Sequence, residues 1–274
     1  MLATIWNTIF FEPILNALLI LYGFLGENLG IAIIVLTVAL RLLLFPLMRS
    51  QLDSTRKLRK IQPQLEKIRE KYKKNPQKIQ EEQLKLYKQV GYNPMGCLAS
   101  VVLPYPFLIA IYQAIRAFSG GKIGYIYPFV KNLLDISGDV DINTRFLLWD
   151  LSKAYLPLAK EHGYFTLWVL AYLLLALLTG LSQYFSVEIN QRMTGTASPK
   201  KDDKKKSKKK DVPSQDMGAM MNEMGKSMKF TFPLMTVFIA LSAPAAVALY
   251  WMVQSWVMIG IQYVYYKFKN NKDE

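Results

Sequence analysis

Arg41 is the residue whose type and position point most clearly to chemistry. It lies in residues 29–48, a run of twenty residues that is otherwise uncharged and largely apolar and that would reach about 30 Å as a helix, the thickness of a bilayer core. An arginine near the middle of a span costs about 2.5–3.5 kcal/mol on insertion scales. Because the run contains no acidic residue, we predict that Arg41 faces a hydrated pocket inside the membrane. The alternative is that it snorkels to the cytoplasmic headgroups, about 10 Å away.

The other residues of the apolar runs argue against catalysis. An intramembrane enzyme needs paired carboxylates, a Ser/His set or a metal motif within its spans, and none is visible. The single Cys97 and the single His162 exclude a disulfide framework and a multi-ligand Cys/His metal site. No phosphate-binding glycine motif is present. We therefore expect no enzymatic activity, no cofactor, no metal and no small-molecule substrate.

The composition and the distribution of charge indicate a membrane protein that crosses the bilayer several times. The 274 residues are 52% hydrophobic, and the net charge is +14. Lys and Arg number zero in residues 1–28, thirteen in 49–95, five in 119–163 and eleven in 188–229. The positive-inside rule places 49–95 and 188–229 in the cytoplasm and 119–163 outside. We expect a plasma (cell inner) membrane protein with its N-terminus outside and its C-terminus in the cytoplasm.

These patterns predict an all-α polytopic membrane protein, a five-span helical bundle with a cytoplasmic helical hairpin. Residues 11–25 are apolar but reach only about 22 Å, so we expect them to lie in the outer interface, with an extra span as the alternative. The predicted segments are an external interfacial helix (1–28), the first span (29–48), a coiled-coil hairpin (49–96), the second span (97–118), an external loop (119–163), the third span (164–187), a basic loop (188–229), the fourth and fifth spans (230–266) and a tail (267–274).

The hairpin prediction depends on apolar residues at heptad spacing on both sides of the helix-breaking Lys74-Asn75-Pro76. The stripes are Leu58, Ile61, Leu65, Ile68 and Tyr72, followed by Ile79, Gln83, Leu86 and Val90. The basic outer face of the hairpin is either merely solvated or in contact with anionic lipid, ribosomal RNA or a targeting partner.

Three details of the later spans are expected from sequence. Pro104 and Pro106 should kink the second span. The fourth span reaches only about 20 Å unless the methionine stripe at 217–228 extends it inward, which we favour over a stripe lying on the membrane. A short span pair would thin the bilayer beside Arg41. The lysine-rich run from Lys200 to Lys210 is expected to be a disordered tether or a binding site.

Several motifs, in order and over nearly the whole chain, resemble the YidC/Oxa/Alb membrane-protein insertases. They are Arg41 with Phe45-Pro46-Leu47, Gln51, Gln62-Pro63, Tyr87-Lys88, Asn93-Pro94, Gly96-Cys97, FLLWDLS at 146–152 and Leu249-Tyr250-Trp251. The chain is similar to the short, five-span form of that family.

The resemblance implies a hydrophilic groove that opens to the cytoplasm and to lipid and is closed outside. The groove arginine of the family matches Arg41, and further groove positions match Gln183, Tyr250, Trp251 and Gln254. Tyr250 and Gln254 are four residues apart and share a helical face. Trp251 directly follows Tyr250 and therefore points in a different direction around the helix, so it could instead be a packing aromatic.

The expected function is insertion of small membrane proteins, in which Arg41 attracts an acidic tail and the adjoining apolar segment slides into lipid. Nascent membrane proteins would be the substrates, the ribosome and the Sec translocon the partners, and anionic lipids a further candidate. The alternative is an anion channel or transporter that uses Arg41, although no inverted repeat is visible. A voltage sensor would need a series of arginines, and a single one is present.

Overall fold

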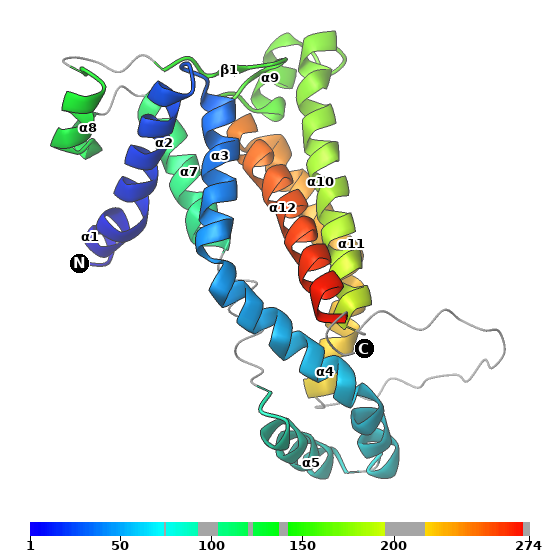
Figure 1. Cartoon of the computed structure of the whole chain (residues 1–274). Helices are drawn as coiled ribbons and strands as arrows, with labels where there is room; N and C mark the ends of the chain where they lie inside the picture. The colour runs from blue at the N-terminus through cyan, green and yellow to red at the C-terminus, as the bar shows by residue number, and fades with distance from the viewer. Residues whose placement is uncertain (74, 93–103, 120–122, 137–141, 195–216, 271–274) are drawn as a thin grey trace.

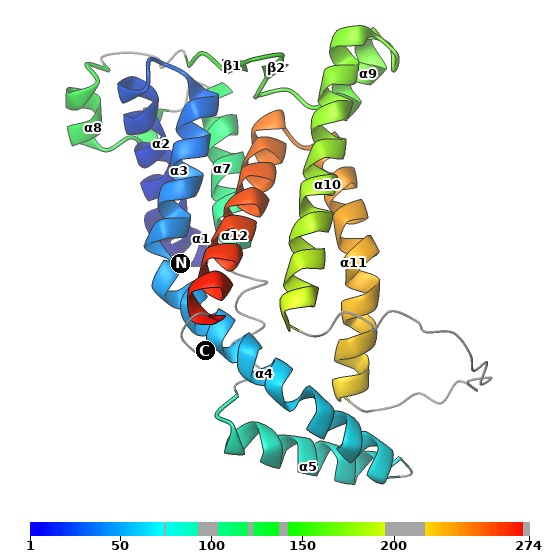
Figure 2. The ribbon, with the colours of Figure 1, turned by 45° about the vertical axis from the view of Figure 1, so that its right-hand side comes forward.

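The protein is described by a computed structural model that covers residues 1–73, 75–92, 104–119, 123–136, 142–194 and 217–270. Apart from one short hairpin of strands, its elements are helices (Figures 1 and 2). They are α1 (Leu2–Trp6), the π-helical η1 (Asn7–Phe11), α2 (Glu12–Phe24), α3 (Leu29–Leu43), α4 (Phe45–Lys71), α5 (Pro76–Gln89), α7 (Pro104–Ser119), the 3-10 turn η2 (Ile123–Tyr125), α8 (Pro128–Leu133), β1 (Arg145–Phe146), β2 (Trp149–Asp150), α9 (Tyr155–His162), α10 (Leu167–Thr194), α11 (Met217–Ser242) and α12 (Ala245–Asn270).

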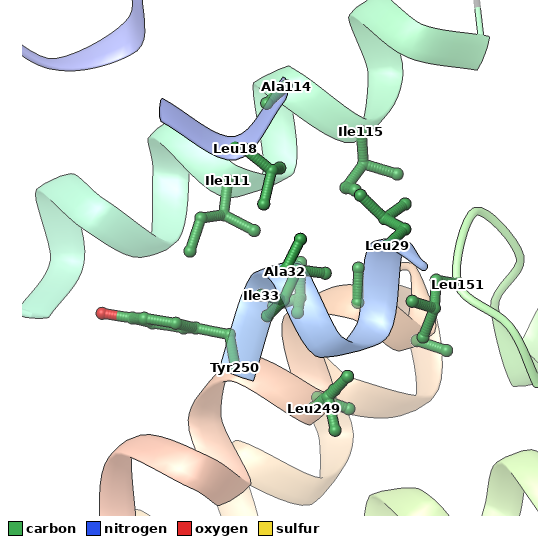
Figure 3. Packing of buried hydrophobic residues seen from close by; sticks show 14 of the residues in the cluster. Leu18, Leu29, Ala32, Ile33, Ile111, Ala114, Ile115, Leu151, Leu249 and Tyr250 are labelled. Carbon is green, nitrogen blue, oxygen red and sulfur yellow. The ribbon is translucent and has the colours of Figure 1, made fainter. Parts of the chain in front are cut away.

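The predicted all-α class is confirmed, and the helices form a bundle around α12. This helix packs against α3, α7 and α10, and α10 packs in turn against α11. Ala110, Ala114, Ala246 and Ala248 are buried where these helices meet, and Figure 3 shows Ala32 and Ala114 among the larger apolar side chains. Small residues let helices approach closely. Close van der Waals packing stabilises helix pairs inside a membrane, where the hydrophobic effect does not drive their association.

The predicted first span is not one straight helix. The structure ends α3 at Leu43 and begins α4 at Phe45, and the two helices are bent by 59° relative to each other. Pro46 lies in the first turn of α4, where its missing N–H costs nothing. Arg41 is therefore in the last turn of α3 and not near the middle of a helix.

The N-terminal helical run is longer than the apolar segment 11–25. The helical run Ala3–Phe24 is long and apolar enough to cross a membrane, and it packs against α3 and α7 with Leu15 and Leu18 fully buried. The length argument for an interfacial helix is therefore wrong. The interfacial placement itself stays a prediction.

The described residues contain three helical runs that could cross a membrane, or up to four if α3 and α4 count as one bent span. The others are Leu167–Arg192 and Ala245–Phe268, and Lys229–Ser242 is a shorter apolar helix. The count of five spans stays a prediction, in part because Cys97 and the first residues of the second span lie outside the described residues. The described part of α7 begins at Pro104, directly after residues outside the description, so the kink expected at Pro104 and Pro106 stays a prediction.

The described part of α11 begins at Met217, so the methionine stripe at 217–228 belongs to the same helix as the fourth span, as we favoured. The apolar part of this helix, Lys229–Ser242, is still short, and a thinned bilayer beside Arg41 stays a prediction. The run from Lys200 to Lys210 lies outside the described residues.

Helices α4 and α5 form the hairpin that the heptads predict. Ile61, Leu65 and Leu86 are buried between them, and the Asn75 side chain caps α5 by accepting from the Lys78 N–H at 3.1 Å. Gln83 is 3% exposed at its heptad position, and its Nε2 has no hydrogen-bond partner in the described structure. The hairpin projects from one end of the bundle, and β1, β2 and α9 lie at the other end (Figures 1 and 2).

The FLLWDLS motif closes that other end. Strands β1 and β2 pair antiparallel, and Phe146 lies so close to Gly30 of α3 that a Cβ there would be 2.1 Å from the ring. The Trp149 indole N–H donates to the Ala171 carbonyl of α10 at 2.8 Å. The Ala245 and Ala246 N–H groups at the start of α12 donate to the Lys153 and Leu151 carbonyls at 2.8 and 3.0 Å.

Candidate functional site

Arg41 is held at the C-terminal end of α3. Its side chain is half-buried, and its Nη1 lies 3.9 Å from the Met48 sulfur, a weak acceptor. No carboxylate among the described residues forms an ion pair with it. The last carbonyls of α3 point toward its end of the helix, and this partial negative charge favours a cation by about 0.3–1 kcal/mol. This helix end therefore offsets part of the free-energy cost of placing the Arg41 charge in an apolar run.

A small cavity lies beside Arg41 between α3, α7 and α12. Its walls are formed by Thr37, Leu40, Arg41, Leu44, Pro104, Phe107 and Tyr250. The space open to the centre of a water molecule is about 10 Å³, which is about what one water needs. The described cavity is thus a pocket for a single water, and it is mostly apolar.

Tyr250 is the predicted site residue that the structure brings to Arg41. It is 3% exposed, and Figure 3 shows its hydroxyl pointing away from the apolar side chains around it. The hydroxyl lies 3.5 Å from the Pro104 carbonyl of α7, at the limit of a hydrogen bond. Tyr250 therefore supplies a polar group to a cavity whose other walls are largely hydrocarbon.

Gln183 is part of a second polar contact, between α10 and α12. The Ser255 hydroxyl lies 2.8 Å from the Gln183 Oε1 and also 2.8 Å from the Trp251 carbonyl, and it can donate to either. One turn away, the Thr179 hydroxyl lies 3.1 Å from the Ala248 carbonyl. Gln183 does not line the Arg41 cavity, so the structure separates these two predicted site residues.

Gln254 and Trp251 have different surroundings although both are buried. Trp251 is 4% exposed and belongs to the apolar core, so it packs there and faces neither lipid nor the cavity. Gln254 is 7% exposed, and its Oε1 has no hydrogen-bond partner among the described residues. A buried acceptor without a donor costs about 1–3 kcal/mol, which marks Gln254 as a group that a ligand could satisfy.

Sequence reasoning missed several residues of the site. Thr37 lies four residues before Arg41, so the shared helical face could have revealed it. Ser255 also lies one helical turn after Trp251. Pro104 and Phe107 come from another helix, and no signal in the sequence assigns them to Arg41.

Ionic groups join the C-terminal part of α10 to the middle of α11. Glu188 accepts from Arg192 at 2.6 Å and also pairs with Lys229 of α11. The Lys229 ammonium lies 5.4 Å from the centre of the Tyr184 ring. Above this cluster the outer sides of both helices are apolar, and the exposed side chains are Leu174, Leu177, Leu181, Leu234 and Phe238. An apolar face of this size indicates contact with lipid.

Residues 20–273 match the family described as "60Kd inner membrane protein".

Individual relatives match over shorter or longer stretches. A protein of Bacillus anthracis named "Membrane protein insertase YidC 2" is 28% identical over 266 residues, which are 95% of this chain and 80% of that protein. A "Membrane protein insertase YidC" of Clostridium tetani is 40% identical over 104 residues, 38% of this chain and 47% of that protein. One of Oceanobacillus iheyensis is 35% identical over 145 residues, 47% of this chain and 57% of that protein. The matched stretch thus spans about half the length of two of these relatives.

Proposed function

Since this chain belongs to the 60Kd inner membrane protein family, we propose that it is a membrane-protein insertase. The resemblance to the YidC/Oxa/Alb family is thereby confirmed. The relatives named above carry the name insertase. The proposed substrates are nascent small membrane proteins whose hydrophilic tails enter the protein from the cytoplasm, and no enzymatic step is needed.

The observation that carries the proposal is Arg41, a half-buried cation at the end of an apolar helix with no carboxylate partner in the described structure. A cation with an internal partner would have no reason to attract a substrate. Two unit charges about 4 Å apart gain roughly 4 kcal/mol at an effective dielectric near 20. This gain offsets part of the cost of bringing a carboxylate into the membrane without trapping it there.

In the proposed sequence of steps, an acidic tail approaches Arg41 and Tyr250 and exchanges part of its hydration for these groups. The apolar segment that follows the tail moves into lipid beside α10 and α12. The β1–β2 hairpin, bonded to the start of α12, supports this direction because it covers the external end of the bundle. The tail must then pass that hairpin to leave on the outer side.

We further propose that the protein lies in the plasma (cell inner) membrane with its N-terminus outside and its C-terminus in the cytoplasm. The basic hairpin α4–α5 would meet the ribosome, the Sec translocon would be a second partner, and anionic lipids would attract the basic segments. The charge distribution of the sequence supports this orientation.

Substitution of Arg41 tests the electrostatic step. In vesicles that contain the purified protein, Arg41→Ala should lower the insertion of a single-span substrate with an acidic tail by about tenfold or more, because a fraction of the charge-pair energy already gives this factor. Arg41→Lys keeps a cation and should retain insertion of some substrates. The measurement is the protease-protected fraction of the tail.

Arg49→Ala is the matched control, because it removes the same charge from an exposed position eight residues on and should insert normally. Wild-type insertion by Arg41→Ala would contradict the proposal. Chloride flux through the same vesicles that is lost in Arg41→Ala would support the anion channel instead. Photo-crosslinkers at Gln183 and Tyr250 should capture the tail of a ribosome-bound substrate.

A further inference from the structure

Two glutamines on α12 are buried with an unsatisfied acceptor each. Gln254 is 7% exposed and Gln262 is 1% exposed, and the Oε1 of each has no hydrogen-bond partner among the described residues. A buried amide oxygen without a donor destabilises a fold. An unsatisfied acceptor that persists in the interior is explained if a donor reaches it from outside the chain.

A third amide presents the complementary group from α4. The Nε2 of Gln51 is buried and also lacks a partner within the described structure, and this atom is a donor. Helices α4 and α12 meet at this level, because the Tyr265 hydroxyl donates to the Asp53 carboxylate. Asp53 is two residues after Gln51 and Tyr265 is three residues after Gln262, so the donor and the acceptor belong to the same region.

The spacing of the two acceptors suits an extended chain. Eight residues separate Gln254 from Gln262, which is about 12 Å along a helix, and the two positions differ by about 80° around its axis. They therefore lie on one side of α12. An extended polypeptide advances about 3.3 Å per residue, so four of its residues cover the distance between the two side chains.

We propose that Gln254, Gln262 and Gln51 bind the backbone of the translocating polypeptide. The two Oε1 atoms accept from its N–H groups, and the Gln51 Nε2 donates to one of its carbonyls. Every residue except proline offers both groups, so this recognition depends on neither charge nor sequence. It rests on the proposed insertase function and extends it to hydrophilic tails without acidic residues, for which Arg41 supplies no attraction.

Methionine substitutions separate this role from a structural one. Methionine has a similar length and removes the orphan acceptor, so Gln254→Met and Gln262→Met should raise the midpoint of thermal unfolding. Insertion of a single-span substrate with an uncharged Ser/Asn-rich tail should fall about fivefold for each variant and about twentyfold for the double variant, the factor expected from losing one or two ordinary hydrogen bonds. Gln89→Met, at an exposed position on α5, is the control and should change neither measurement.

A photo-crosslinker at Gln262 gives a second readout that does not depend on the stability of a variant. It should capture the substrate tail, whereas a crosslinker at Trp256, which is 55% exposed, should not. If the methionine variants are more stable and insert the uncharged tail at the wild-type rate, or if Gln262 captures no tail, the inference is wrong. Failure of the wild-type protein to insert any substrate would instead overturn the proposed function itself.

Discussion

At the scale of single residues, Arg41 is tolerated without a carboxylate because its position combines several weak effects. It sits beside the last carbonyls of α3, near the Met48 sulfur and beside a cavity for about one water. None of these neutralises the charge. The guanidinium is consequently stable enough for the fold and still free to attract an anionic group.

Gly30 is a position where adding a single methyl group should lower the stability of the fold. In Gly30→Ala the new Cβ would meet the Phe146 ring at about 2 Å, so the ring and the β1–β2 hairpin must shift. We expect the midpoint of thermal unfolding to fall, by the 1–3 kcal/mol that overpacking usually costs. The measurement is thermal unfolding in detergent.

Phe146→Ala supplies the test of that mechanism. Alanine lacks the Cγ atom that the new Cβ would meet first, so the double variant Gly30→Ala/Phe146→Ala should be more stable than the sum of the two single changes predicts. Additive effects in this double-mutant cycle would contradict a steric origin.

At the scale of elements, hydrogen bonds between side chains and backbone groups hold the β1–β2 hairpin on the bundle. Asp150 accepts from the hydroxyls of Thr144 and Ser152 at 2.7 and 2.6 Å, and its N–H donates to the Tyr172 hydroxyl of α10. Asn16 similarly bonds the backbone of Tyr125 and Tyr127. In the sequence Asn16 interrupts an apolar helix, whereas in the structure it attaches a loop to that helix.

Asp150 should make the stability of this hairpin depend on pH. Burial raises the pKa of Asp150, but hydrogen bonds from Ser152 and Thr144 and the nearby Lys153 lower it overall. Its stabilising contribution is therefore present above the ordinary value near 3.9 and is lost as pH falls through the lower folded pKa. Hydrogen exchange of the Ala245 and Ala246 amides should accelerate, relative to its intrinsic rate, between about pH 4 and pH 2 and stay constant above pH 5.

Asp150→Asn removes the titrating group and keeps the side-chain shape. The acceleration on the acid side should disappear in this variant. If the exchange of the two amides keeps the same pH dependence, another group is responsible.

At the scale of the whole molecule, the start of α4 is what joins the helical hairpin α4–α5 to the bundle. This helix contacts α10 as well as α3, and Met48 and Leu52 are buried there. The Tyr265 hydroxyl of α12 donates to Asp53 of α4, and the chain bends at Leu44 between α3 and α4. The Tyr265–Asp53 hydrogen bond is thus one of the contacts that orient the hairpin relative to the bundle.

Tyr265→Phe should therefore loosen the hairpin without unfolding either part. Spin labels at Gln77 in α5 and Leu181 in α10, in a Cys97→Ser background, should give a broader distance distribution while helix content stays unchanged. Tyr263→Phe is the matched control, since Tyr263 is 61% exposed on the same helix. An unchanged distance distribution in Tyr265→Phe would show that the Tyr265–Asp53 hydrogen bond does not orient the hairpin.

The sequence by itself determined the features that depend on local pattern. Apolar run lengths predicted the helices, heptads predicted the α4–α5 contact, and an arginine in an apolar run pointed to Arg41, because the cost of burying a charge depends little on the detailed fold. Motif order supplied Tyr250 as its neighbour only through the family resemblance.

Only the tertiary structure decided which groups meet. Pro104 and Phe107 lie beside Arg41, and Gln183 contacts Ser255 instead of lining the same cavity. Trp251 is buried in the core, and the acceptors of Gln254 and Gln262 have no donors among the described residues. The first span is also bent at Leu44. The physical reason is that contacts between helices depend on the rotation and crossing of whole elements, which the periodicity of a single helix does not contain.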